Sequence, residues 1–333
     1  MIGILAFSEK GRALAREVGG KLASAEPVDY YDRTAEAARE YVAKHFQEYD
    51  KFLFIGAAGI CVRMIAPHIT RKDEDPAVVV MDELGRYAIS LLSGHIGGAN
   101  AFTYTVAAAA GAEPVITTAT DINEKFAADV WATEAGCRIE DISKIRFISG
   151  ALLAGEPVGM DPGPFPVEGE LPSGLVLLGQ SLKQGISVSL SGGQTTYPET
   201  LNVIPRIVSV GIGCRRGTPA EKLEAFVLET LAEAGISMLA VETIASIDLK
   251  KDEAGIRAIA EKYRIPFLTF TAEELMEVEG EFDHSAFVEK TTGADNVCER
   301  SCVRAGGGRL LIRKTARDGM TLAASIRDWR IQF

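Results

Sequence analysis

The stretch ISLLSGHIGGANAF, Ile89–Phe102, places one histidine in a glycine-rich loop between an apolar run and a small-residue run. His95 is the loop's one side chain that can transfer a proton near neutral pH. The loop is expected to open a helix, whose free N–H groups and dipole favour a carboxylate or a phosphate. The loop residues predicted to contact such a ligand are Ser93, Gly94, Gly97, Gly98 and Asn100. A structural interpretation fits the spacing equally well, with glycines for close helix–sheet packing and His95 as the cap of a strand.

The loop does not follow a nucleotide-binding pattern. It lacks the G-x-G-x-x-G spacing, and no lysine followed by serine or threonine closes it as in a P-loop. The segment before the loop supplies further groups for the same candidate site, namely one glycine, two cations and two adjacent acids: Gly59, Arg63, Lys72, Asp82 and Glu83.

A second candidate anion site is the segment GIGCRRG, in which a predicted strand ends in a glycine turn ahead of a helix. Backbone amides and forked guanidinium groups suit a carboxylate, which selects Gly213, Arg215 and Arg216. A structural turn with solvated arginines is the alternative. Cys214 is a poor candidate for a nucleophile, because the one histidine of this region, His284, lies in an acidic, polar segment.

A third cluster, SIDLKKDE, places Lys250 among acids where a helix is predicted to begin. Asp252 as the N-cap of that helix explains part of the pattern without any function. Lys250 is therefore a candidate ligand-binding cation, and the other charges are more simply explained as a solvated helix start.

The formal net charge of −11 argues against nonspecific nucleic-acid binding, which needs a basic surface. It does not exclude a small anionic ligand, because local cations can still form a positive cleft. The five cysteines are scattered and form no CxxC pair, so they predict reduced thiols rather than a metal site or a disulfide framework. No apolar run is long enough for a transmembrane helix, and the N-terminal residues lack a signal-peptide pattern. These features predict a cytoplasmic protein.

The elements that must position these groups alternate between strand and helix at both ends of the chain. The pattern predicts two α/β domains with mixed sheets flanked by helices, joined by a smaller irregular middle domain rich in glycine and proline. The expected boundaries are 1–121, 122–205 and 206–333. Two helix starts have cap signatures: Thr218 with Pro219 and Glu221, and the capping box of Thr271 with Glu274.

Five segments closely resemble one family, the cobalt-precorrin-5A hydrolases, which are also called protein G of anaerobic cobalamin biosynthesis. The segments are GICVRMIAPHITRKDEDPAVVVMDELGRYAISLLSGHIGGANAF, PVITTATD, VGIGCRRGTPAEKL, ASIDLKKDEAGI and TGADNVCER. The resemblance is strong over Lys51–Asp121 and Arg206–Ser325 and weak over the middle. The long N-terminal motif is specific, whereas the C-terminal domain also occurs as a separate cobalamin-pathway protein.

The resemblance implies a corrinoid substrate that carries cobalt and many carboxylates, so that the protein needs no cofactor or metal of its own. The implied reaction opens the δ-lactone of ring A and releases a two-carbon unit as acetaldehyde. The resemblance also leaves room for transient contact with neighbouring cobalamin-pathway enzymes, and it implies neither nucleic acid nor membrane as a partner.

We interpret the candidate residues accordingly. His95 is expected to be the general base, with Asp82 or Glu83 as the next candidates, and amides of the Gly94–Gly98 turn to stabilise an oxyanion. The cations expected to hold substrate carboxylates are Arg63, Lys72, Arg215 and Arg216. Two other functions stay open: a corrinoid carrier or scaffold without chemistry, and a nucleotide-dependent enzyme.

Overall fold

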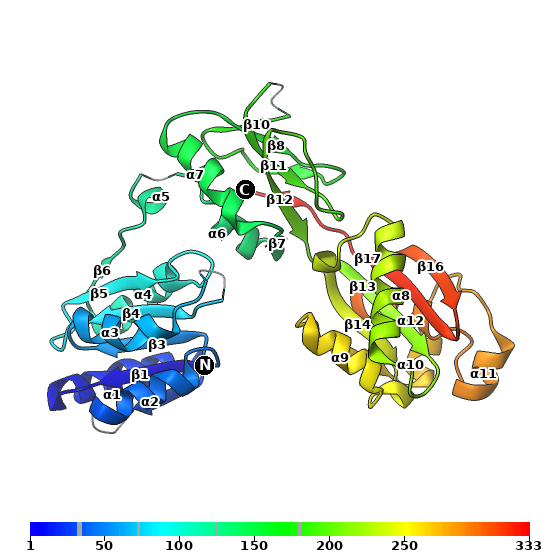
Figure 1. The fold of residues 1–333 in the computed structure, drawn as a ribbon, viewed down its shortest axis with the longest axis horizontal. Helices are drawn as coiled ribbons and strands as arrows, with labels where there is room; N and C mark the ends of the chain where they lie inside the picture. The colour runs from blue at the N-terminus through cyan, green and yellow to red at the C-terminus, as the bar shows by residue number, and fades with distance from the viewer. Residues whose placement is uncertain (32–34, 72–73, 124, 179–180) are drawn as a thin grey trace. The chain divides into compact units, whose positions relative to one another are not determined.

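A computed structural model describes residues 1–333 apart from 32–34, 72–73, 124 and 179–180. The described chain forms two compact units, Met1–Val130 and Trp131–Phe333 (Figure 1). Within the described residues, no helix combines the length and the apolarity needed to cross a membrane.

The first unit contains a six-stranded sheet in the order β2-β1-β3-β4-β5-β6. Strands β4 and β5 pair antiparallel and the other neighbours pair parallel. The elements are β1 (Ile2–Ala6), α1 (Glu9–Leu22), β2 (Val28–Tyr31), α2 (Ala35–His45), β3 (Lys51–Ile55), α3 (Ala58–Ile65), η1 (Ala66–His68), β4 (Ala77–Met81), β5 (Tyr87–Leu92), α4 (Ala99–Ala110), β6 (Glu113–Val115), α5 (Ala119–Ile122) and the start of α6 (Ala128–Glu134).

Alternating side chains of the central strands fill two separate cores in this unit. Leu53 and Val79 pack with α1 and α4 on one face of the sheet. Phe54 and Val80, one residue further along each strand, pack with α2 and α3 on the other face. The unit is therefore a three-layer α/β/α sandwich, and its inner strands are apolar on both faces, as buried parallel strands are.

The second unit begins with a five-stranded sheet in the order β10-β8-β11-β12-β7, which the sequence did not predict. The dense glycines and prolines lie between its strands, where Gly163, Gly169 and Gly174 adopt positive φ angles. The elements are β7 (Cys137–Ile139), η2 (Ile142–Lys144), α7 (Ile145–Leu153), β8 (Val158–Asp161), β9 (Val167–Glu168), β10 (Leu175–Leu177), β11 (Gln184–Val188) and β12 (Glu199–Pro205).

A second five-stranded sheet follows, in the order β15-β14-β13-β17-β16. The elements are β13 (Val208–Cys214), α8 (Ala220–Glu233), η3 (Met238–Ala240), β14 (Val241–Ile247), η4 (Asp248–Lys250), α9 (Ala254–Lys262), β15 (Phe267–Phe270), α10 (Ala272–Met276), α11 (Ala286–Thr292), α12 (Cys298–Gly306), β16 (Arg309–Arg317), β17 (Met320–Ile326) and β18 (Ile331–Gln332). Both predicted α/β domains are thus present as mixed sheets flanked by helices, which confirms the predicted fold class.

The packing of α12 explains one glycine of the GIGCRRG segment. A Cβ atom added to Gly211 would lie 1.8 Å from the carbonyl oxygen of Cys298, at the start of α12. Helix α12 therefore approaches β13 so closely that only glycine fits, on the face of the sheet opposite α8.

The two predicted helix caps of this sheet have different outcomes. Thr271 and Glu274 form the predicted capping box at α10. The prediction for Thr218 is wrong, because its hydroxyl donates to the carbonyl of Arg215 and α8 begins only at Ala220, after Pro219.

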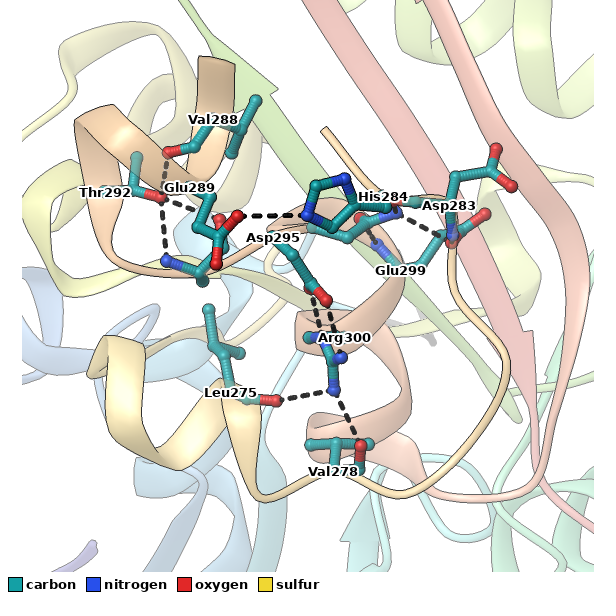
Figure 2. A network of polar contacts seen from close by, with 12 residues as sticks. Leu275, Val278, Asp283, His284, Val288, Glu289, Thr292, Asp295, Glu299 and Arg300 are labelled. Atoms are coloured by element: carbon teal, nitrogen blue, oxygen red, sulfur yellow. Dashed lines mark hydrogen bonds and ion pairs between the residues drawn. The ribbon is translucent and has the colours of Figure 1, made fainter. Parts of the chain in front are cut away.

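The TGADNVCER motif forms a buried polar network that holds the start of α12 (Figure 2). The Arg300 guanidinium donates to both carboxylate oxygens of Asp295, at 2.6 and 3.0 Å. It also donates to the carbonyls of Leu275, in the last turn of α10, and Val278, just after that helix. Every group in this set has a partner within the protein, so this motif is explained by structure alone.

The same network contains a fully buried carboxylate, Glu299. Its oxygens accept hydrogen bonds from the amides of Asp283 and Lys314 and from the Asn296 side chain, at 2.7–2.8 Å. One side chain thereby ties together the loop before α11, the start of α12 and the edge strand β16.

The last residues of the chain return to the middle segment. Strand β18 pairs with β9, and Phe333 stacks on Trp131 with ring centroids 5.4 Å apart. The Trp131 indole also donates to the carbonyl of Gln332 at 2.9 Å.

Candidate functional site

His95 lies between two carboxylates in the first unit. Its Nδ1 is 3.2 Å from an oxygen of Asp129, and its Nε2 is 2.7 Å from Oδ2 of Asp121. The Thr120 hydroxyl is also 3.2 Å from Nε2. Both ring nitrogens of His95 are thus held, which fixes the orientation of the imidazole. A role as the cap of a strand end would not account for contacts at both nitrogens.

A shell of neutral polar groups orients the Asp121 carboxylate. Its Oδ2 accepts hydrogen bonds from the Thr118 hydroxyl at 2.5 Å and from the Asn100 amide at 3.3 Å. Asn100 is buried, donates also to Thr118, and accepts from Ser90 in β5. Asn100 was predicted to contact a ligand, and in the structure it connects β5, α4 and the segment after β6.

The two carboxylates change the charge state of the imidazole. The hydrogen bond to Asp129 is the largest influence, burial opposes it, and Asp121 adds to it, so that the pKa of His95 rises to about 9. Burial by itself would raise the pKa of Asp121, but the hydrogen bonds from Thr118 and His95 outweigh it and lower that pKa below its ordinary value. At neutral pH the site therefore holds an imidazolium between carboxylates.

The backbone of the loop is strained and tightly packed. Ser93 adopts a left-handed φ of 58°, and a Cβ at Gly97 would lie 2.3 Å from the Ser93 Cβ. Gly98 is the N-cap of α4, and its amide already donates to the carbonyl of His95. In the part of the chain that the structure describes, the amides of Gly94 and Gly97 have no acceptor, so they are available to donate to a ligand.

The other two predicted acids lie at the far end of β5. Asp82 and Glu83 form the β4–β5 turn, whereas His95 follows the end of β5. The six residues of β5 separate these positions by about 20 Å. Asp82 accepts from the amides of Leu84, Arg86 and Tyr87, and Glu83 accepts from Ser8. The geometry gives both acids structural roles and does not bring them to His95.

The predicted cations near the loop are also separated from it. Gly59 lies in the first turn of α3, at the carboxyl end of β3, and the Arg63 guanidinium donates back to the Gly59 carbonyl at 3.1 Å. This is the same edge of the sheet as the Asp82–Glu83 turn. Lys72 lies outside the described residues.

Two family models match the chain, described as Cobalamin synthesis G N-terminal, over residues 40–121, and Cobalamin synthesis G C-terminus, over residues 208–325. The cobalt-precorrin-5A hydrolase of Salmonella typhimurium is 38% identical over 291 residues, which cover 84% of this chain and 83% of the relative. The chain belongs to the cobalt-precorrin-5A hydrolase family. This confirms the resemblance seen in the sequence motifs.

Further relatives agree with this family membership. The cobalt-precorrin-5A hydrolase of Priestia megaterium is 32% identical, over 84% of this chain and 79% of the relative. Protein CobE of a Sinorhizobium species is 31% identical over 118 residues, which cover 34% of this chain and 76% of that protein.

The remaining candidate residues of this family member lie in the second unit, where β13 and β14 end. The Arg215 amide donates to the Gly319 carbonyl in the β16–β17 turn, and a Cβ at Gly213 would meet the Thr321 hydroxyl. Arg216 is exposed. Lys250 pairs at 3.1 Å with the buried Glu253, which also accepts from the Gly217 amide. Gly213 and Lys250 are therefore tied into the fold, and Arg216 points to solvent.

Burial raises the pKa of the Cys214 thiol, which keeps it protonated and argues further against a nucleophilic role. Ser93 offers no alternative nucleophile, because its buried hydroxyl has no hydrogen-bond partner among the described residues and so does not contact His95.

Sequence reasoning missed Asp121 and Asp129 as members of the site. Asp121 carried a signal, because it ends the PVITTATD motif, but it was used only as a domain boundary. Asp129 carried none: it lies 34 residues after His95 in a segment assigned to the next domain.

Proposed function

We propose that this chain is the hydrolase that opens the ring-A δ-lactone of cobalt-precorrin-5A and releases acetaldehyde in anaerobic cobalamin biosynthesis. The names of its relatives support the reaction. The structural observation that carries it is the His95 imidazole held by Asp121 and Asp129 beside the unpaired amides of Gly94 and Gly97.

This arrangement supplies what ester hydrolysis requires. Water attacks the lactone carbonyl, the negative charge that develops on its oxygen is stabilised by the Gly94 and Gly97 amides, and the His95–Asp121 pair transfers the proton. Cobalt arrives within the substrate, so the protein's own residues contribute binding and proton transfer, and the reaction proceeds without a further cofactor.

The second unit carries a candidate carboxylate-binding site of its own. Arg215 and the exposed Arg216 follow β13, at the carboxyl edge of a sheet where α/β proteins commonly bind ligands. Guanidinium groups there pair with the carboxylates of the corrinoid periphery. The enzyme works in the cytoplasm, where its five free cysteines stay reduced. There it makes transient contact with neighbouring enzymes of the cobalamin pathway.

The decisive experiment measures acetaldehyde released from cobalt-precorrin-5A by the wild-type chain and by His95→Gln. The substitution breaks the His95–Asp121 pair on which proton transfer depends, and we expect turnover to fall by about 10²–10⁴-fold. His284→Gln is the matched control, because His284 is exposed and pairs with Glu289 in the second unit. A wild-type chain that binds the corrinoid but releases no acetaldehyde in a single turnover would instead be a carrier.

A further inference from the structure

The hydrogen-bond count at His95 determines which protons the ring carries. A neutral imidazole has one N–H donor and one acceptor nitrogen. Both nitrogens of His95 face carboxylate oxygens, which only accept. With both carboxylates ionised, the ring satisfies both contacts only when both nitrogens carry a proton, that is, as an imidazolium.

The two carboxylates differ in their access to solvent. The Asp129 side chain is 6% exposed, whereas the Asp121 side chain is 36% exposed. Asp129 is thus the inner partner of the ring, and Asp121 is the group that a substrate or a water molecule can reach.

The two oxygens of the Asp121 carboxylate differ in their hydrogen bonds. The donors from His95, Thr118 and Asn100 all use Oδ2 of Asp121. Within the described ranges, Oδ1 has no hydrogen bond. The Asp121 carboxylate is therefore held rigidly through Oδ2, and its Oδ1 is available to a water molecule or a substrate.

We propose that Asp121 is the general base of the lactone hydrolysis and that His95 and Asp129 are positioning residues that keep it ionised and oriented. This assignment rests on the proposed function, and it reverses the roles predicted from the sequence, in which His95 was the base. It uses the one group of the cluster that is both exposed and able to accept a proton.

The step balances within the protein and the substrate. The water oxygen forms a bond to the lactone carbonyl carbon while Oδ1 of Asp121 takes the water proton. The ring C–O bond then breaks, and the departing alkoxide oxygen takes the same proton from Asp121. Water and lactone become a carboxylic acid and an alcohol, and the imidazolium of His95 keeps its protons throughout.

Among the described residues, the titratable groups that contact the ring are Asp121, from α5, and Asp129, from α6. Thr120, Thr118 and Asn100 complete the polar surroundings and do not titrate between pH 5 and 10. A pH profile can therefore separate the two assignments. With Asp121 as base, whose pKa lies below its ordinary value, kcat/KM is flat through neutral pH and falls as His95 loses its proton near pH 9. With His95 as base, kcat/KM rises with pH up to that point.

A second test needs no substrate. Nitrogen-15 NMR of the full chain follows the four histidines, with His95→Gln identifying the signals of His95. We expect both ring nitrogens of His95 to be protonated at pH 7 and the ring to titrate well above the ordinary histidine range, with Asp129→Asn lowering that midpoint. A neutral ring at pH 7 in the wild-type chain would overturn the proposal.

The third test is turnover by Asp121→Asn, which keeps the shape of the side chain and removes the base. We expect kcat to fall by about 10²–10⁴-fold with KM little changed. Asp141→Asn is the control, because Asp141 is a carboxylate that caps η2 in the second unit. Turnover by Asp121→Asn within a few-fold of wild type would exclude Asp121 as base. Absence of acetaldehyde from the wild-type chain would instead refute the proposed function and leave the NMR result standing.

Discussion

His95 shows how a residue that is hard to interpret in a sequence is defined by its contacts. The glycines around it predicted an anion site, and its pKa of about 9 comes from two aspartates far along the chain. In the proposed function the charge has a second effect, since a cation beside Asp121 offsets the repulsion between that carboxylate and a carboxylate of the substrate.

The raised pKa makes the stability of the first unit depend on pH. The pKa of an unfolded histidine is about 6.5, so the contribution of His95 to stability is complete below that pH and is lost as pH rises through about 9. Because solvent screens part of this half-buried pair, we expect a contribution on the order of 1 kcal/mol. Hydrogen exchange of β4 amides should report a lower free energy of unfolding for His95→Gln than for wild type at pH 6. The two free energies should be equal near pH 10. An unfolding difference that is independent of pH would contradict this.

Individual elements were predictable where hydrophobic periodicity is strong. The sequence pattern predicts a helix over Glu9–Leu22 and strands over Lys51–Ile55, Ala77–Met81 and Tyr87–Leu92, and α1, β3, β4 and β5 have these bounds. The strands alternate their side chains between two cores, and α1 buries one face in one of them. The middle sheet was missed because its strands are short and its glycines and prolines lie close together in sequence. Thr218 is of a residue type that often caps helices, but its hydroxyl donates to the Arg215 carbonyl in the preceding turn.

The candidate site was predictable only as far as its local part. The loop from Ser93 to Asn100 was recognised because its residues are contiguous. Asp121 and Asp129 are brought to it by the path of the chain after β6, which no local pattern encodes. Asp82 and Glu83 were chosen for nearness in sequence, and the antiparallel turn between β4 and β5 places them at the opposite edge.

Close packing between α12 and β13 gives a prediction at the scale of elements. Gly211→Ala places a methyl group against the Cys298 carbonyl, which is backbone and cannot turn aside. We expect a loss of about 3 kcal/mol in the free energy of unfolding, measured by chemical denaturation of the full chain. Gly20→Ala in α1 is the control: a Cβ there meets nothing within 4 Å, and a helix gains about 0.5–1 kcal/mol from the exchange. Equal effects of the two variants would exclude the packing argument.

At the scale of the whole molecule, the second unit is closed by contacts between its first and last residues. Trp131 is 8% exposed, donates to the Gln332 carbonyl and stacks on Phe333. Strand β18 adds the amides of Ile331 and Phe333, which donate to Pro166 and Glu168. These contacts join the middle segment to the end of the chain.

Trp131→Ala should therefore release the end of the chain. We expect a cost of about 3–5 kcal/mol, seen first as faster hydrogen exchange of the Ile331 and Phe333 amides. Trp131→Phe keeps a ring to stack on Phe333 and loses the indole donor, so its cost should be about 1 kcal/mol. Unchanged exchange at both amides in Trp131→Ala would show that β18 is held by other contacts.

The return of β18 to β9 also means that the C-terminal sheet is an insertion. The chain leaves the middle segment at Pro205, and the Arg327 amide donates to the Ile207 carbonyl, so entry and exit lie side by side. A module with adjacent ends can be excised or exchanged as a cassette, because a short bridge closes the gap at little entropic cost. The C-terminal sheet could therefore be replaced without cutting the part of the chain that builds the His95 site.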